Sequence, residues 1–174
     1  MNNELISKQL IKFNSLVDFL IKGFTKYDLD EHTIVFLAKL TKKFMKFTHL
    51  TVLNILFKIL TRFAGAKNLF DKYILDTNLI VDNVFRQIEI SLNNILTNKV
   101  GIDNQEEVDN IISNLNFIKK IITNLAEMAI SVLKYQSNTI DEDEFKKEYR
   151  QFKDRFETDK KTFEDEIKKD VSEL

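Results

Sequence analysis

The scarcity of helix-breaking residues constrains this chain more than any other feature of its sequence. The 174 residues contain no proline and only three glycines, Gly23, Gly65 and Gly101. At ordinary usage, a chain of this length would hold about 9 prolines and about 12 glycines. Proline removes a backbone donor and clashes with the preceding turn, and glycine loses the most conformational entropy in a helix. The sequence therefore predicts long, uninterrupted helices.

Apolar residues recur at steps of three and four along nearly the whole chain, which is the period of an amphipathic helix. This periodicity predicts helices over residues 4–24, 30–46, 49–63, 67–99, 103–136 and 141–172. The third of these segments is apolar on nearly every side, so we expect it to be buried, and either separate from the second helix or continuous with it. Its β-branched residues leave a strand as the alternative, although no turn residues mark a hairpin. The expected fold class is an all-α bundle of five or six helices.

Glycines and capping residues predict where these helices begin and end. The three glycines stand where helix C-termini commonly place this residue. An acidic or hydroxyl residue followed three positions later by glutamate is typical of a helix start. Three such pairs occur, namely Asp28–Glu31, Asp103–Glu106 and Thr139–Glu142. Asp30 competes with Asp28 as the cap of the second helix.

The segment after residue 136 differs in kind from the rest of the chain. Its apolar positions form one narrow stripe among charged residues: Phe145, Tyr149, Phe152, Phe156, Phe163, Ile167 and Val171. Their spacing averages about 3.6 or 3.7 residues per turn, which does not favour a regular left-handed coiled coil. We predict a helical bundle core over residues 1–136 and a long charged amphipathic helix over 137–174. This C-terminal helix either belongs to the same domain or protrudes as an arm.

Charge and composition exclude several classes of protein. The net charge of −1 gives no overall field toward nucleic acid or lipid, but residues 1–67 carry 11 basic and 5 acidic side chains, whereas residues 138–174 carry 9 and 13. The chain has no cysteine, which excludes disulfides, thiolate metal sites and thiol nucleophiles. The first residues lack the pattern of a signal peptide. The longest run without a charged residue, 47–57, is too short to cross a bilayer. We therefore expect a cytoplasmic protein.

No group of residues has the spacing of a catalytic or cofactor site. The two histidines are His32 and His49, and the residues three positions before them are Leu29 and Lys46. Neither histidine therefore belongs to the Glu-x-x-His motif of a di-iron bundle. Asp28 and His32 could supply two metal ligands on one helical turn, but further ligands would have to come from elsewhere, so capping and ordinary surface polarity are the favoured explanation. The sequence has no nucleophile elbow and no phosphate-binding glycine loop. We predict no enzymatic activity, no cofactor and no metal site.

A row of lysines defines one candidate binding surface. Four lysines fall at positions i, i+3, i+4 and i+7 on one face of the predicted second helix, with three phenylalanines nearby: Lys39, Lys42, Lys43 and Lys46, and Phe36, Phe44 and Phe47. Such a face could bind the phosphates of nucleic acid or of membrane headgroups, or an anionic protein. The alternative is a solvated helix face, or one that meets the acidic C-terminal helix of the same chain.

The aromatic stripe near the C-terminus defines a second candidate surface, formed by Phe145, Tyr149, Phe152 and Phe156. Burying one such ring is worth about 1.5–3 kcal/mol, so the stripe needs a cover. That cover is either the chain's own bundle or a partner, which would be a second copy or another protein. We predict a non-catalytic protein–protein interaction or assembly protein, with an anionic-surface binder acting through Lys39–Lys46 as the alternative. The Lys-rich, Arg-poor composition is typical of an AT-rich genome and fits an accessory factor of a bacterium or phage.

Overall fold

The computed structural model describes residues 3–26, 28–63, 69–98 and 103–172, and within these ranges the chain is helical apart from short turns. The side chains of residues 170 and 171 lie outside the description. No strand occurs in the described ranges, so the predicted all-α fold is confirmed. The elements in chain order are α1 (Asn3–Lys26), α2 (Glu31–Phe47), η1 (Thr48–Leu53), α3 (Asn54–Thr61), α4 (Asp71–Thr97), α5 (Gln105–Gln136) and α6 (Glu142–Ser172).

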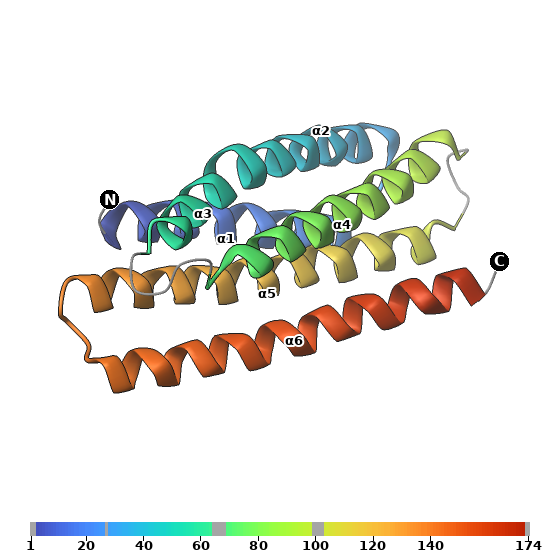
Figure 1. Ribbon diagram of the computed structural model, residues 1–174. Coiled ribbons are helices and arrows are strands. Elements are labelled where there is room, and N and C mark those ends of the chain that lie inside the picture. The colour runs from blue at the N-terminus through green and yellow to red at the C-terminus, as the bar shows by residue number, and fades with distance from the viewer. Residues whose placement is uncertain (1–2, 27, 64–68, 99–102, 173–174) are drawn as a thin grey trace.

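The helices pack as a bundle around α5. This helix contacts α1, α3, α4 and α6, whereas α2 contacts α1 and α4. Figure 1 shows α2 along one side of the bundle and α6 along the opposite side, next to α5. The N-terminal helices and the charged C-terminal helix therefore present two separate surfaces of the molecule.

The second and third predicted helices form one continuous rod. Thr48, which follows α2, and Asn54, which follows η1, both have right-handed helical backbone angles, so the helix is not broken at either junction. Between α2 and α3 the backbone runs as the π-helical segment η1, and the hydroxyl of Thr48 donates to the carbonyl of Phe44 at 2.9 Å. The continuous alternative is thus correct, and the strand alternative for this segment is wrong. A π segment inserts extra backbone into the helical turn and shifts the faces of the flanking helices.

Gly23 does not end the first helix as expected. It lies inside α1, which runs on to Lys26. A Cβ atom placed on Gly23 would come within 2.7 Å of Cδ2 of buried Leu37 in α2. The absence of a side chain at Gly23 therefore lets α1 and α2 approach closely. The predicted helix ends at Gly65 and Gly101 lie outside the described residues.

The observed N-terminal caps differ in part from the predicted ones. Asp30 caps α2, because its Oδ1 accepts from the backbone N–H of Thr33 at 2.8 Å, and this hydrogen bond holds the pKa of Asp30 below its usual range. Asp141 accepts from the N–H of Glu144 at 2.8 Å at the start of α6. The Asp28–Glu31 and Thr139–Glu142 boxes are therefore wrong as caps. At the start of both α2 and α6, the cap is the aspartate directly before the first helical turn.

The rod Glu31–Thr61 is long and apolar enough, by length and composition, to cross a membrane. It is the one such helix within the described residues, and 44% of its most apolar window is buried inside the bundle. Its buried side chains include Leu37, Phe44 and Val52. Phe44 also stacks on Phe13 of α1 at a ring-centroid distance of 5.3 Å. Part of the apolar surface of the rod is therefore used in the core of the bundle.

Candidate functional site

The aromatic stripe expected to contact a partner is buried within the chain's own bundle. Phe145, Phe152 and Phe156 are buried, with 2% and 1% of the surface of the last two exposed, and Tyr149 is half-buried. These rings project from α6 toward α5, the start of α4 and the end of the α3 rod. Of the two covers considered for the stripe, the chain's own bundle and a partner, the structure shows the first. In this fold, a partner therefore has no access to the three phenylalanines.

Aromatic rings from four parts of the chain interlock around α6. Phe145 stacks on Tyr135 at a centroid distance of 4.7 Å and lies 5.2 Å from Phe63. Tyr73 of α4 makes edge-to-face contacts with Phe152 and Phe156, each at 5.1 Å. Burial raises the pKa of the Tyr73 phenol well above its usual range, and its hydrogen-bond contact with the hydroxyl of Tyr149 at 3.3 Å adds to this shift. The geometry is that of a packed core, in which aromatic pairs add stability beyond that expected from their buried surface area.

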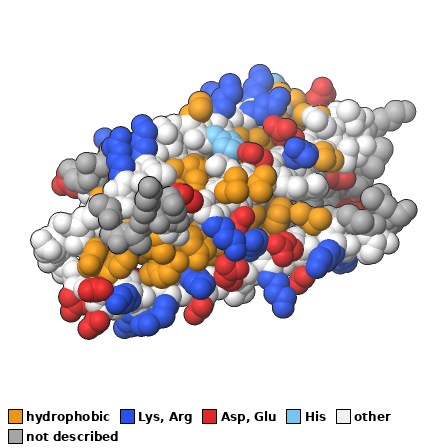
Figure 2. Space-filling model, viewed as in Figure 1, with side chains coloured by type: hydrophobic (Ala, Val, Ile, Leu, Met, Phe, Trp, Pro, Cys, Tyr) orange, Lys and Arg blue, Asp and Glu red, His pale blue; other side chains and the backbone are white. Residues whose placement is uncertain are grey.

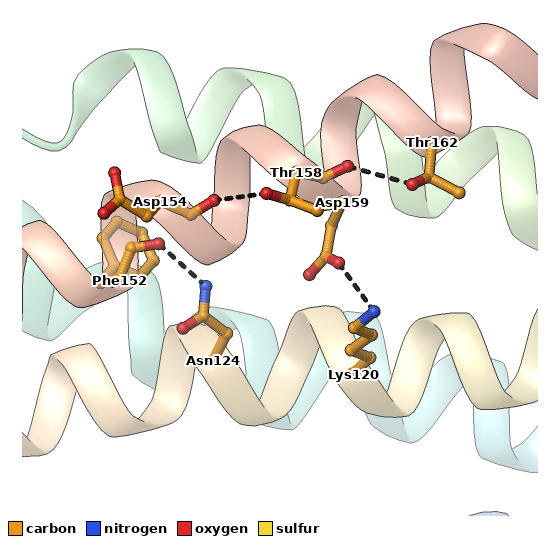
Figure 3. Close-up of polar contacts among 7 residues, drawn as sticks. All are labelled: Lys120, Asn124, Phe152, Asp154, Thr158, Asp159 and Thr162. Carbon is orange, nitrogen blue, oxygen red and sulfur yellow. Dashed lines mark hydrogen bonds and ion pairs between the residues drawn. The ribbon is translucent and has the colours of Figure 1, made fainter.

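Polar contacts along the seam between α5 and α6 align the two helices (Figure 3). The amide of Asn124 donates to the backbone carbonyl of Phe152 at 3.2 Å, and Nζ of Lys120 lies 3.2 Å from Oδ1 of Asp159. The Asp159 side chain is only 3% exposed, whereas its lysine partner is 67% exposed. Asp159 Oδ2 and Asn124 Oδ1 have no hydrogen-bond partner among the described residues. The seam therefore contains incompletely paired polar groups, and a buried polar atom without a partner lowers the stability that such a seam can provide.

A hollow of about 580 Å³ follows this seam, but its cations are already paired. Lys119 contacts Asp18 at 2.7 Å, and Arg155 contacts Glu127 at 2.9 Å. With the Lys120–Asp159 pair, each of the three cations that line the hollow has a carboxylate partner. An ionic ligand would have to displace these partners, which makes the hollow a poor candidate for binding one.

The lysine face of α2 has the opposite character. Lys39, Lys42, Lys43 and Lys46 are all exposed, and none of them is in an ion pair with a described residue. Figure 2 shows Lys and Arg side chains gathered over α2 along the upper edge of the molecule. The C-terminal helix packs on α5, on the side of the bundle away from α2, and forms its inter-helix ion pairs with α4 and α5. The acidic C-terminal helix therefore does not cover the lysines.

The three phenylalanines predicted near the lysines have three different environments. Phe44 is buried in the core, and Phe47 lies under Nζ of Lys12, 4.6 Å from its ring centroid. Phe36 is 55% exposed. It borders an apolar groove of about 610 Å³ between α1 and α2, whose lining comprises Phe19, His32, Thr33, Val35, Phe36, Leu37 and Lys39. An exposed apolar groove thus adjoins the unpaired lysines.

The lysines that α1 contributes to this surface were not predicted from the sequence. Lys12 contacts Phe47 and Phe19 lines the groove, so both face α2. Residues at steps of three and four from them share this face, and they include Lys8, Lys22 and Lys26, all exposed. The spacing of these lysines is visible in the sequence, but the pairing of α1 with α2 is not. We call the eight lysines 8, 12, 22, 26, 39, 42, 43 and 46 the basic face.

The histidines form no metal site with the residues that the structure describes, where no group of three or more potential ligands occurs. His32 lies at the edge of the α1–α2 groove, and Asp28 is exposed. Nε2 of His49 lies 3.3 Å from Oδ1 of Asp82, and its ring meets Phe85 edge-on at 5.3 Å. The carboxylate partner of His49 comes from α4, so local spacing could not reveal it. His49 links the π segment to α4.

Comparisons with known proteins add no identity to this geometry. No protein-family model, no curated protein and no solved structure matches the chain.

Proposed function

We propose that this chain is a non-catalytic binding protein that engages an anionic partner through its basic face. The observation that supports this proposal most strongly is the state of Lys39, Lys42, Lys43 and Lys46, which are exposed and free of ion pairs with described residues. Lysines that are already hydrated and unpaired lose little when they bind an anion, because no existing carboxylate has to leave. The cations of the α5–α6 hollow lack this property.

The proposal keeps the predicted role in interaction or assembly and moves it to another surface. A partner or a second copy reaches the aromatic stripe only after α6 has left the bundle, which would expose Phe152 and Phe156. The basic face needs no such rearrangement. A cytoplasmic location stays a prediction.

Retention on immobilised heparin, a generic polyanion, tests the proposal. We expect the triple variant Lys39→Gln, Lys43→Gln, Lys46→Gln to elute at clearly lower salt than the unaltered chain, because fewer cations displace counterions from the polyanion. The matched control is Lys147→Gln, Lys153→Gln, Lys161→Gln, which removes three exposed lysines from α6 and changes the net charge equally. The control is expected to elute with the unaltered chain. Equal losses in both variants would contradict a specific basic face.

A further inference from the structure

Exposed apolar side chains lie among the lysines of the basic face. Phe36 of α2 and Phe19 of α1, which is 43% exposed, border the groove between the two helices. Leu50, which lies one turn beyond Lys46, is 72% exposed. A surface used only for electrostatic contact gains nothing from such residues, because they bind no anion. Their position among lysines fits a partner with both anionic and apolar parts.

The lysines and apolar residues form two parallel stripes. Along α2, the residues His32, Phe36, Lys39, Lys43 and Lys46 follow steps of four, three, four and three, which keep them on one face of the helix. All five are exposed. The facing stripe on α1 carries Lys8, Lys12, Phe19, Lys22 and Lys26. At 1.5 Å per residue, α1 is about 36 Å long and α2 about 25 Å. Two packed helices of these lengths form a broad surface rather than a point-like site.

Charge is distributed unevenly across the molecule. The basic face lies on α1 and α2, whereas the segment 138–174, which holds α6, carries 13 acidic and 9 basic side chains. Figure 1 places α6 on the side of the bundle away from α2. A molecule with this polarity orients in the field of an extended anionic surface, with α1 and α2 toward the surface and α6 away from it.

We infer that the anionic partner is the surface of a lipid bilayer that contains acidic headgroups, an inference that rests on the proposed function. Lysines on the polar part of a helical surface, combined with phenylalanine and leucine, are typical of proteins that lie in the headgroup region. Nucleic acid fits the surface less well. The four arginines of the chain stand at positions 62, 86, 150 and 155, outside the basic face, so no forked phosphate or base contact is available there. Aliphatic Leu50 also has no partner on a sugar–phosphate backbone.

Co-sedimentation with large unilamellar vesicles tests the inference on the full chain. We expect binding to vesicles of phosphatidylcholine with one quarter phosphatidylglycerol, and little binding to pure phosphatidylcholine. Each lysine near an acidic bilayer contributes about 1 kcal/mol, so the triple Lys39→Gln, Lys43→Gln, Lys46→Gln should weaken partitioning about a hundredfold. The control triple on α6 should bind the acidic vesicles as the unaltered chain does.

The apolar contribution is tested by Phe36→Ser. This variant should weaken vesicle partitioning about tenfold, because one ring no longer enters the boundary between headgroups and acyl chains. Its matched control is Leu75→Ser on α4, which removes another exposed apolar side chain and should leave partitioning unchanged. Circular dichroism of each variant confirms that the helical fold is retained.

The outcomes separate this inference from the proposed function. One outcome is that the basic-face triple loses heparin retention while the unaltered chain binds acidic and neutral vesicles equally. This result overturns the inference of an acidic bilayer and leaves a polyanion-binding protein. The bilayer is likewise overturned if the unaltered chain binds duplex DNA or poly-glutamate but not acidic vesicles. If the basic-face triple and the α6 control behave alike on heparin and on vesicles, both proposals are wrong.

Discussion

A chain that ends at Gln136 is expected to lose its cooperative unfolding transition and to bind the dye anilinonaphthalene sulfonate at neutral pH. This truncation removes α6 and with it the buried rings of Phe145, Phe152 and Phe156. At about 1.5–3 kcal/mol for each buried ring, the loss amounts to about 5–9 kcal/mol. A domain of this size has a total stability of about 5–15 kcal/mol. Thermal unfolding followed by near-ultraviolet circular dichroism, with dye fluorescence, measures the effect.

A second truncation, after Glu164, provides the control. It keeps every buried residue of α6, because the side chains described beyond this position are exposed. We expect this shorter chain to unfold within about 1 kcal/mol of the full chain, as is usual for changes at exposed sites. If ending the chain at Gln136 leaves a cooperative transition of similar midpoint, α6 is a separate arm and the packing described above is wrong.

Phe156→Ala is expected to lower the free energy of unfolding by about 3–5 kcal/mol, the range for removing a buried phenylalanine ring. The ring is 1% exposed and contacts Tyr73 at 5.1 Å and Phe152 at 5.8 Å. Alanine leaves a cavity that the neighbouring rings, held by α4 and α6, cannot close. Urea denaturation, monitored by far-ultraviolet circular dichroism, gives the difference.

The same substitution at an exposed ring checks that burial is the cause. Phe36→Ala removes a ring that is more than half exposed, so we expect a change of about 0.5 kcal/mol or less. Losses of equal size at Phe36 and Phe156 would mean that α6 does not pack as described. Since Phe36 belongs to the proposed binding surface, this variant should keep its stability, while its partitioning to acidic vesicles should weaken about tenfold.

Helix positions could be predicted from the sequence because they depend on local periodicity. The observed α4, α5 and α6 begin within four residues of the predicted starts and end within two of the predicted ends. The errors concern glycine and caps. Gly23 resembles a helix end in sequence, but its role is set by Leu37 of another helix. Thr139 and Asp141 both suit a cap, and only the geometry of the turn decides between them.

The cover of the aromatic stripe could not be predicted from the sequence. A narrow apolar stripe on a charged helix looks the same whether the chain or a partner covers it. The rings that meet it, Phe63, Tyr73 and Tyr135, come from three other elements. Their approach to α6 depends on long-range packing. The polar seam at Asp159 was also hidden, because a lone aspartate on an amphipathic helix gives no sign of burial.

The candidate binding surface could be predicted in part. Spacing alone placed Lys39 to Lys46 on one exposed face, and the structure shows them exposed. The groove and the lysines of α1 depend on which helix packs beside α2, and periodicity does not give that information. Lys12 over Phe47 is one contact that fixes this pairing.

Iodide quenching of two single-tryptophan variants reports on both helical surfaces together, because the natural chain has no tryptophan. One reporter stands on α6, which closes the core, and the other on α2, which faces the anionic surface. Tryptophan introduced by Phe36→Trp should be quenched strongly in buffer and become protected when acidic vesicles are added. Tryptophan introduced by Phe145→Trp should be protected in both conditions. Strong quenching of the α6 reporter in buffer, or unchanged quenching of the α2 reporter with vesicles, would contradict the account.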